Sequence, residues 1–266
     1  RLTLTLPPPS TTDQTDDWSR LQTALRQQTG IDSFRIELPL LRRVGRVLRE
    51  GDWRATALIE TDAWDRPDGP ARVIELWPGH APDDAPLWAT AIDIGTTTVT
   101  LWLVDLLTGQ VRAQVAEYNG QIARGEDVIS RIIYAAKNGG SAELRSLVLG
   151  TINALLERAC NRVQIAPQEV FKATIAGNST MMHLLLDIPA ESIRLSPFIT
   201  AVNHVPTLLA EDTGLAIHPH ATVDCLPGVA SYVGADLTAG VLSSGLADAE
   251  SVTLFLDVGT NGETVL

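Results

Sequence analysis

The apolar and polar positions follow one pattern up to about residue 80 and a different one beyond it. In the first part, two stretches carry apolar side chains at helical spacing, and a glycine that favours a helix end follows each of them. Two shorter apolar runs typical of strands come next, separated by a segment rich in proline and glycine. The pattern predicts a helix that Asp17 caps and Gly30 ends, a helix at residues 39–50, and strands at residues 53–60 and 71–77.

Beyond residue 86, apolar runs and amphipathic stretches alternate. The order they predict, three strands followed by αβαβα, is that of a ribonuclease-H-like unit, and a last strand begins a second repeat. Residues 190–220 carry prolines and no regular period, which predicts a surface loop or an insertion. The expected elements are strands at 88–93, 99–104 and 111–117, helices at 126–137 and 141–159, a strand at 170–176, a helix from 179, a strand at 221–226, a helix at 233–242 and a strand at 251–258.

These patterns predict a linker at residues 1–16, with a short strand open as an alternative for residues 2–6, a small α+β domain at residues 17–85 and an α/β domain at residues 86–266. Within the α/β domain, residues 86–250 are expected to form a first lobe, and residues 251–266 to begin a second lobe that continues beyond this chain. Docking, dimerisation and a purely structural spacer stay open as roles of the small domain.

The composition excludes several classes of protein. The 266 residues are 45% hydrophobic and 20% charged, which is typical of a folded globular protein. The formal net charge of -12 makes nucleic acid and anionic membranes poor partners, because phosphate groups need cationic neutralisation. No apolar run is long enough to span a bilayer. Cys160 and Cys225 match no metal-site spacing, and we expect two buried, reduced thiols in a cytoplasmic protein.

Two segments far apart in the sequence resemble each other, DIGTTT at residues 93–98 and DVGTNGE at residues 257–263. Glycine lets the backbone approach a polyphosphate closely, and successive N–H groups and threonine hydroxyls can bind its oxygens. An aspartate at the strand end attracts Mg²⁺ through the water shell of the ion. One such turn is more often an ordinary β-turn, but two at matching points of a repeated topology predict a nucleotide site. We expect Asp93 and Asp257 to end neighbouring strands whose glycine bends converge across one crevice.

The two turns resemble the phosphate motifs of the superfamily that contains actin, Hsp70 and the sugar kinases. Longer segments are similar to one branch of it, the ATP-dependent reductive activators of corrinoid enzymes. The resemblance extends over roughly residues 17–266. The segments that carry it are NGQ at 119–121 with GEDVISRI at 125–132, AGNSTMMHLL at 176–185, LP at 226–227 with YVGAD at 232–236, and DVGTNGE at 257–263.

The resemblance implies an actin-like ATPase fold for residues 86–266, preceded by the small α+β domain. It implies that ATP and Mg²⁺ are used to return a corrinoid cobalt from Co(II) to Co(I), with a corrinoid protein or a corrinoid-dependent methyltransferase as partner. The electron is implied to come from a plant-type [2Fe–2S] domain, which is expected only before this chain, since the chain starts at Arg1 without a methionine. The adenosine-binding loop is expected beyond residue 266.

Carried over by position, the resemblance assigns Mg²⁺ binding through water to Asp93 and Asp257. Glu126, Asp127 and Glu263 are implied as candidates for polarising the attacking water or completing the metal shell. The residues implied to bind phosphate or to face the cleft are Gly95, Thr96, Thr97, Thr98, Asn178, Gly259, Thr260, Asn261 and Gly262.

Other functions stay open at this stage. A metabolite kinase of the same superfamily needs a catalytic base, for which Asp127 is a candidate. A chaperone-like or scaffolding ATPase would use the nucleotide only to set a conformation. A homodimer is a further hypothesis. Asp236 either caps a helix or faces the cleft, and His183 is expected to be a hydrogen-bonded histidine at a helix edge rather than a ligand.

Overall fold

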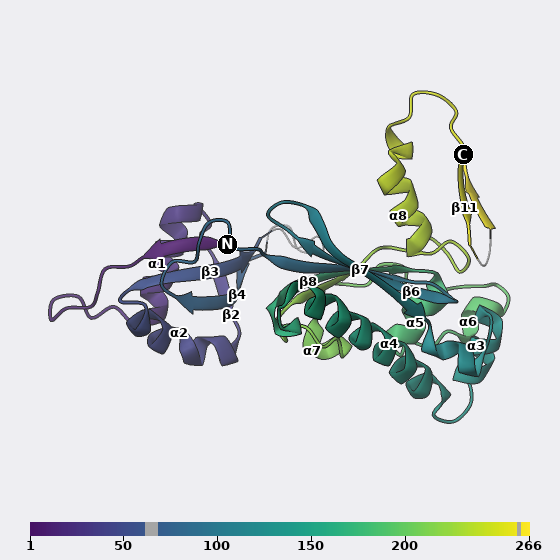
Figure 1. Cartoon of the computed structure of the whole chain (residues 1–266), viewed down its shortest axis with the longest axis horizontal. Helices are drawn as coiled ribbons and strands as arrows, with labels where there is room; N and C mark the ends of the chain where they lie inside the picture. The colour runs from purple at the N-terminus through teal and green to yellow at the C-terminus, as the bar shows by residue number, and fades with distance from the viewer. Residues whose placement is uncertain (62–68, 260–261) are drawn as a thin grey trace. The chain divides into compact units, whose positions relative to one another are not determined.

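The computed structural model describes residues 1–61, 69–259 and 262–266. Its contacts divide the chain into two units, Arg1–Ala85 and Pro86–Leu266. Each unit has its own sheet and its own apolar core (Figure 1). None of the described helices combines the length and the apolarity that crossing a membrane requires.

The first unit is a four-stranded sheet packed against two helices. Its elements are β1 (Leu2–Thr5), α1 (Asp17–Thr29), β2 (Phe34–Ile36), α2 (Leu38–Glu50), β3 (Arg54–Glu60) and β4 (Ala71–Pro78), and the strand order is β1-β3-β4-β2. Apolar residues of the two helices, among them Leu21, Leu25 and Leu48, are buried in the core of this unit. The helices therefore form because their apolar stripes are covered by the sheet.

The start of this unit differs from the linker predicted at residues 1–16. β1 pairs antiparallel with β3, and the chain is held there because Leu4 and Leu6 are each only 2% exposed in the core. Asp16, rather than Asp17, caps α1, since its side chain accepts a hydrogen bond from the N–H of Ser19. Part of the turn predicted between β3 and β4 lies outside the described residues.

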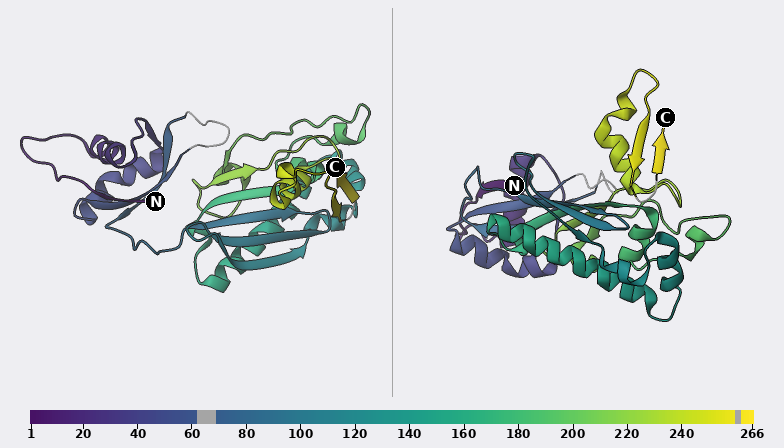
Figure 2. Two further views of the ribbon diagram at one scale, coloured as in Figure 1. Left: turned by 90° about the horizontal axis from the view of Figure 1, so that it is seen from above. Right: turned by 45° about the vertical axis from the view of Figure 1, so that its right-hand side comes forward.

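The second unit is built on a six-stranded mixed sheet whose order is β7-β6-β5-β8-β10-β9. Its strands are β5 (Trp88–Ile94), β6 (Thr98–Asp105), β7 (Gln110–Tyr118), β8 (Val170–Gly177), β9 (Leu208–Leu209) and β10 (Thr222–Cys225). The strands β5, β6 and β7 form an antiparallel meander, whereas β5, β8 and β10 are parallel (Figure 2). The carboxyl ends of β5, β8 and β10 therefore lie at one edge of the sheet, where open α/β sheets bind ligands.

Helices and one hairpin complete the second unit. They are the 3₁₀ turns η1 (Gly120–Arg124), η2 (Pro167–Glu169) and η3 (Leu246–Asp248), the helices α3 (Val128–Ala135), α4 (Gly140–Val163), α5 (Ser179–Leu185), α6 (Glu191–Arg194), α7 (Ala210–Thr213) and α8 (Ala235–Ser244), and the strands β11 (Phe255–Val258) and β12 (Gly262–Val265). The long helix α4 lies along one face of the sheet, and α8 with the hairpin lies on the other side (Figures 1 and 2).

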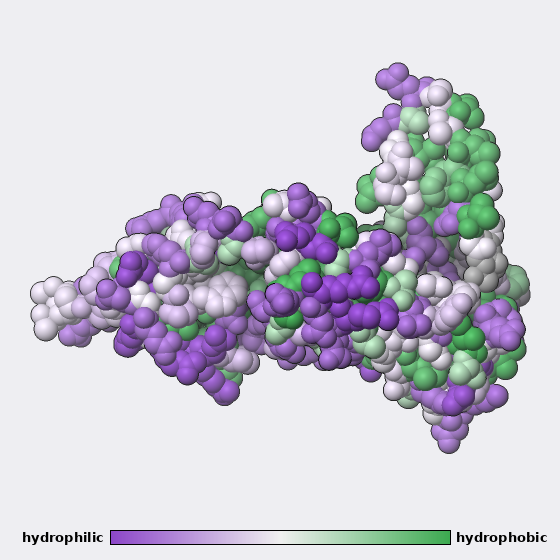
Figure 3. Space-filling model, in the orientation of Figure 1, coloured by the Kyte–Doolittle hydropathy of each residue, from purple (hydrophilic) through white to green (hydrophobic). Residues whose placement is uncertain are grey.

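The hairpin is where the structure departs most from the predicted topology. β11 pairs with β12 in a separate two-stranded sheet, so it does not neighbour β5 as expected. Figure 3 shows apolar residues gathered on α8 and this hairpin, and Leu242, Val252 and Val258 are exposed there. The stretch at residues 190–220, predicted to be irregular, contains α6, β9 and α7. These short elements were missed because four residues or fewer are too short to show a period.

Candidate functional site

The two aspartate turns line one pocket of the second unit. This cavity has a volume of about 280 Å³ and lies at the carboxyl edge of β5 and β8. Both predicted metal residues, Asp93 and Asp257, are part of it. The full lining is Asp93, Gly95, Thr96, Thr97, Thr98, Thr100, Asn178, Asp236, Asp257, Gly259 and Glu263. The expected convergence of the two turns is therefore present, although their strands belong to different sheets.

The turn between β5 and β6 is held from its inner side through its carbonyl groups. Asn119 donates from its side-chain amide to Gly95 O at 3.0 Å and from its backbone to Thr97 O at 2.8 Å. Arg131 donates to Thr96 O at 2.5 Å. In a trans peptide the N–H points opposite to the C=O. The N–H groups of Thr96 and Thr97 therefore point away from the Asn119 and Arg131 anchors, as a phosphate-binding turn requires.

A second wall of the pocket is set by the start of α5. Asn178 caps this helix by accepting from Met181 N at 3.0 Å, and it also donates to the hydroxyl of Thr96 at 3.0 Å. The segment before α8 approaches it so closely that a Cβ on Gly234 would lie 2.5 Å from the Cα of Asn178. This approach brings Asp236, in the first turn of α8, to the pocket. Its side chain accepts from Leu237 N at 2.9 Å, but the N-cap position of α8 is Gly234 and no side chain caps the helix, so of the two alternatives for Asp236 the structure favours the one that faces the pocket.

The pocket is strongly acidic. Burial, together with the charges of Asp236 and Asp257, raises the pKa of Asp93 from 3.8 to about 6. Burial and the charge of Asp257 raise the pKa of Asp236, and burial with the charges of Asp236 and Asp257 raises that of Glu263. The lining contains no lysine or arginine among the described residues. A bare polyphosphate would be repelled here, so an anion has to enter together with a cation that offsets these carboxylates.

The pocket offers carboxylate oxygens, the ligand type that Mg²⁺ prefers. Among the described residues, no group of three His, Cys, Asp or Glu side chains comes close enough to hold a metal directly. Mg²⁺ dehydrates reluctantly and is usually held by one or two carboxylates, phosphates and several waters. The donor set therefore fits Mg²⁺ in complex with a phosphate ester, bound largely through water.

Several predicted residues lie away from the pocket or outside the described part of the chain. Thr260 and Asn261 are outside the described residues, and Gly262 begins β12 without lining the cavity. Glu126 and Asp127 are exposed and do not line it either. The catalytic role of these two residues therefore stays a prediction.

Asp127 has a clear structural task instead. It caps α3, accepting from Ser130 N at 2.8 Å while the Ser130 hydroxyl accepts from Asp127 N at 3.2 Å. This reciprocal pair is a capping box, which stabilises a helix start. One oxygen of the Asp127 carboxylate is therefore engaged by a backbone donor at the start of α3.

We predict that Asp127→Ala lowers the free energy of unfolding by about 1 kcal/mol, the usual effect of losing a cap. Its affinity for Mg·ATP and its rate of ATP hydrolysis are expected to equal those of the wild-type protein. Chemical denaturation and steady-state hydrolysis measure the two quantities. Loss of hydrolysis with unchanged nucleotide affinity would restore the catalytic interpretation of Asp127.

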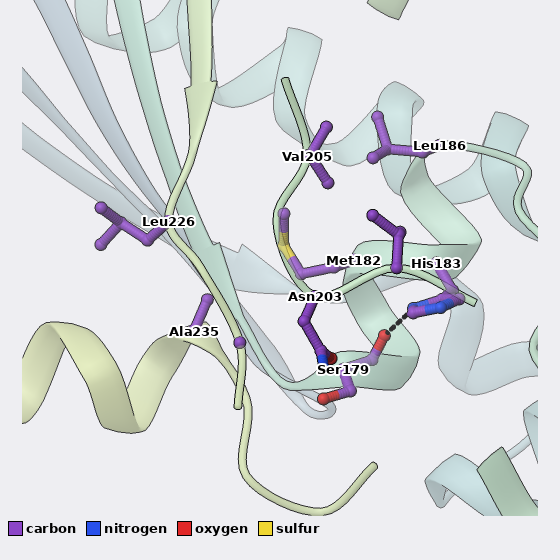
Figure 4. A pocket seen from close by; sticks show the side chains of 10 residues that line it. Ser179, Met182, His183, Leu186, Asn203, Val205, Leu226 and Ala235 are labelled. Atoms are coloured by element: carbon purple, nitrogen blue, oxygen red, sulfur yellow. Dashed lines mark hydrogen bonds between the residues drawn. The ribbon is translucent and has the colours of Figure 1, made fainter. Parts of the chain in front are cut away.

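His183 is a structural histidine of α5, as expected. Its Nδ1 donates to Ser179 O at 2.6 Å (Figure 4). Its Nε2 accepts from the N–H of Ala201 at 3.1 Å. Burial lowers its pKa. Both ring nitrogens are therefore occupied, which leaves no position for a ligand. Burial raises the pKa of the Cys160 thiol to about 11 and that of Cys225 to about 12, so neither thiol is reactive at neutral pH.

Comparison with known proteins agrees with this fold. Residues 88–249 match the family model of the RACo middle region, and residues 1–83 match that of the RACo linker region. The chain belongs to the RACo family. The predicted family is thereby confirmed, and each of the two units of this RACo-family chain corresponds to one of the two regions.

Two relatives of this RACo-family chain carry descriptive names. Corrinoid activation enzyme RamQ of Eubacterium limosum is 35% identical over 193 residues, which cover 72% of this chain and 32% of RamQ. A solved structure, the reductive activator for corrinoid, iron-sulfur protein, is 38% identical with a TM-score of 0.88, covering 99% of this chain and 41% of that one. The similarity confirms the predicted α/β fold, and this chain spans less than half the length of either relative.

Sequence reasoning gave no role to Thr100, which lines the pocket, or to Asn119 and Arg131, which anchor its first turn. Arg131 donates to the carbonyl of Thr96 in the first turn. The sequence pattern predicted no such contact, because an arginine on an amphipathic helix usually faces water. A signal was present in the same segment. Gly125 precedes the helix, and a Cβ there would meet Ser130 Oγ at 2.5 Å and Arg131 N at 2.9 Å. A glycine at that position indicates that the helix start folds back on the chain before it.

Proposed function

We propose that this chain is the ATP-binding part of a reductive activator that returns the cobalt of a corrinoid protein from Co(II) to Co(I). The observation that carries the proposal is the meeting of two aspartate turns at one acidic pocket whose first turn directs its N–H groups outward. The names of its relatives, a corrinoid activation enzyme and a reductive activator, support the reaction.

Within the pocket, Asp93, Asp236 and Asp257 hold the water shell of Mg²⁺. The N–H groups of Thr96 and Thr97 bind phosphate oxygens, because they point away from the carbonyl anchors of the turn. The hydroxyls of these two pocket-lining threonines are further candidate ligands. The metal supplies the positive charge that stabilises the phosphates during transfer.

Glu263 is the residue we assign to orienting the attacking water. Its carboxylate lines the pocket, and burial with the neighbouring acidic charges raises its pKa, which favours a general base. Hydrolysis converts ATP and water to ADP and phosphate. One electron from a reduced [2Fe–2S] cluster, which we place outside this chain, converts Co(II) to Co(I). The change of nucleotide state is proposed to make that unfavourable transfer proceed. The kinase alternative is weakened, because Asp127 caps a helix instead of facing the pocket.

The experiment mixes the full-length gene product with the corrinoid protein of the same organism and a chemical reductant, and follows the reduction of the corrinoid cobalt. We expect Mg·ATP to be required for the change from the Co(II) to the Co(I) absorption spectrum. Asp257→Ala is expected to slow that change by about 10-fold or more, the effect typical for residues that organise a metal site. Asp248→Ala removes an exposed acidic residue of η3 outside the pocket and is the matched control.

An unchanged rate in Asp257→Ala, or reduction that proceeds equally without nucleotide, would contradict the proposal. Rapid phosphorylation of a small metabolite in the absence of a corrinoid protein would favour the kinase instead. The cobalt spectrum and the release of ADP are followed in the same sample, so that the two outcomes are separated.

A further inference from the structure

Arg131 is a fully buried cation directly beneath the first phosphate turn. Its side chain is 0% exposed, although arginine is rarely buried without a specific partner. The guanidinium donates to Thr96 O at 2.5 Å and to Gly125 O at 2.9 Å, and also to the side-chain oxygen of Gln121 at 3.1 Å and the sulfur of Met181 at 3.2 Å. One side chain therefore connects the turn after β5 with the start of α3 and with α5.

These acceptors are all uncharged, which leaves the positive charge of Arg131 unneutralised by a hydrogen-bonded carboxylate. Burial lowers its pKa to about 10, opposed by the charge of Asp127, so the group is still a cation at pH 7. A buried charge is costly unless something nearby makes use of it. The pocket on the other side of the turn is acidic and has no cation among its described lining residues.

We propose that Arg131 is the positioning residue of the phosphate site, which fixes the turn through the Thr96 carbonyl and gives it positive potential from its inner side. The peptide group between Thr96 and Thr97 stands between the guanidinium and the pocket. Its carbonyl is held by Arg131, and its N–H points the opposite way, toward the ligand. The aligned cation and dipole favour an anion where the surrounding carboxylates disfavour one.

This inference rests on the proposed ATP site and specifies how that site tolerates a polyphosphate. Replacing Arg131 would lower the stability of the fold whether its role is to position the phosphate site or only to hold the fold together. Loss of stability alone therefore does not separate these two roles. The distinguishing quantity is the affinity for phosphate groups relative to the affinity for the nucleoside. Loss of a positioning residue lowers the affinity for the phosphate groups and leaves the affinity for the nucleoside unchanged.

The test measures binding of Mg·ATP and of adenosine to the full-length protein by calorimetry, with wild type, Arg131→Met and Arg131→Lys. We expect Mg·ATP affinity to fall on the order of 10-fold in Arg131→Met, as expected for losing a charged hydrogen-bond network, with adenosine affinity unchanged. Arg131→Lys retains the charge but not the forked geometry, and a smaller loss of several-fold is expected. Leu156→Ala, a fully buried residue of α4 in the core, is the matched control for loss of stability and should keep both affinities.

If Arg131→Met does not fold, the two affinities are compared between Arg131→Lys and the wild-type protein. The inference is overturned if a folded Arg131 variant binds Mg·ATP as tightly as wild type, or if adenosine affinity falls by the same factor. Failure of the wild-type protein to bind Mg·ATP would instead overturn the proposed function, and this inference with it.

Discussion

Asp93→Asn is expected to weaken Mg·ATP binding by about 10- to 100-fold and, at the same time, to make the nucleotide-free protein more stable at pH 7.5. The loss of affinity follows from the loss of a pocket carboxylate that we propose holds the metal through water. The gain in stability follows because Asp93 is partly buried beside Asp236 and Asp257, which disfavours its charged form in the folded state.

The pH dependence of this gain has a defined direction. The folded pKa of Asp93, about 6, lies above its unfolded value of 3.8, so its contribution to stability is complete below pH 3.8 and is lost as the pH rises through about 6. A difference of this size corresponds to at most about 3 kcal/mol, which partial exposure reduces to about 1–2 kcal/mol. The advantage of Asp93→Asn should therefore be full at pH 7.5 and smaller at pH 5.

Urea denaturation without nucleotide at the two pH values measures this effect, and calorimetry measures the affinity. Asp105→Asn is the matched control, because Asp105 ends β6 at the opposite end and accepts from Leu87 N, Leu107 N and the Thr108 hydroxyl. That control should lose stability and keep its nucleotide affinity. If the wild-type protein is instead more stable than Asp93→Asn at pH 7.5, the carboxylates of the pocket do not repel one another as argued.

Gly234→Ala is expected to lower the free energy of unfolding by about 1–3 kcal/mol and to weaken Mg·ATP binding on the order of 10-fold. Its new Cβ would lie 2.5 Å from Asn178 Cα and 2.8 Å from Ser179 N, and both of these are backbone atoms. The segment before α8 must then move away from α5. That movement displaces Asp236 and disturbs the cap of Asn178, both of which line the pocket.

Gly228→Ala is the control from the same segment. The nearest atom to a Cβ there is Val233 O at 3.6 Å, an ordinary contact, so stability and affinity should stay close to wild type. Thermal unfolding and calorimetry on both variants give the comparison. Equal behaviour of the two alanines would mean that the close approach at Gly234 does not position the pocket.

The parts of the site that the sequence predicted are those fixed by local rules. An aspartate at the end of an apolar strand, followed by glycine and threonine, has few alternatives to a tight polar turn, so Asp93 and Asp257 were found from their immediate neighbours. The parallel arrangement of β5 and β8 also follows from the alternation of strands and helices. Such features need no knowledge of distant contacts.

The remainder depends on tertiary contacts that a pattern does not contain. A carboxylate just before a helix is equally compatible with a cap and with a catalytic base, and only the contact with Ser130 shows that Asp127 is a cap. Arg131 is buried because three separate segments supply its four acceptors, which no single window of sequence reveals. The separate sheet of β11 and β12 is likewise a matter of which strands pair over long range.

The most direct test of the account is a crystal structure of the full-length protein with Mn²⁺ in place of Mg²⁺ and a non-hydrolysable ATP analogue, with the metal located by its anomalous scattering. The account predicts a metal peak, with ordered water, between the carboxylates of Asp93 and Asp257, and phosphate oxygens at the N–H groups of the turn after β5. A metal and nucleotide bound elsewhere, or the two carboxylates on opposite sides of the molecule, would contradict it.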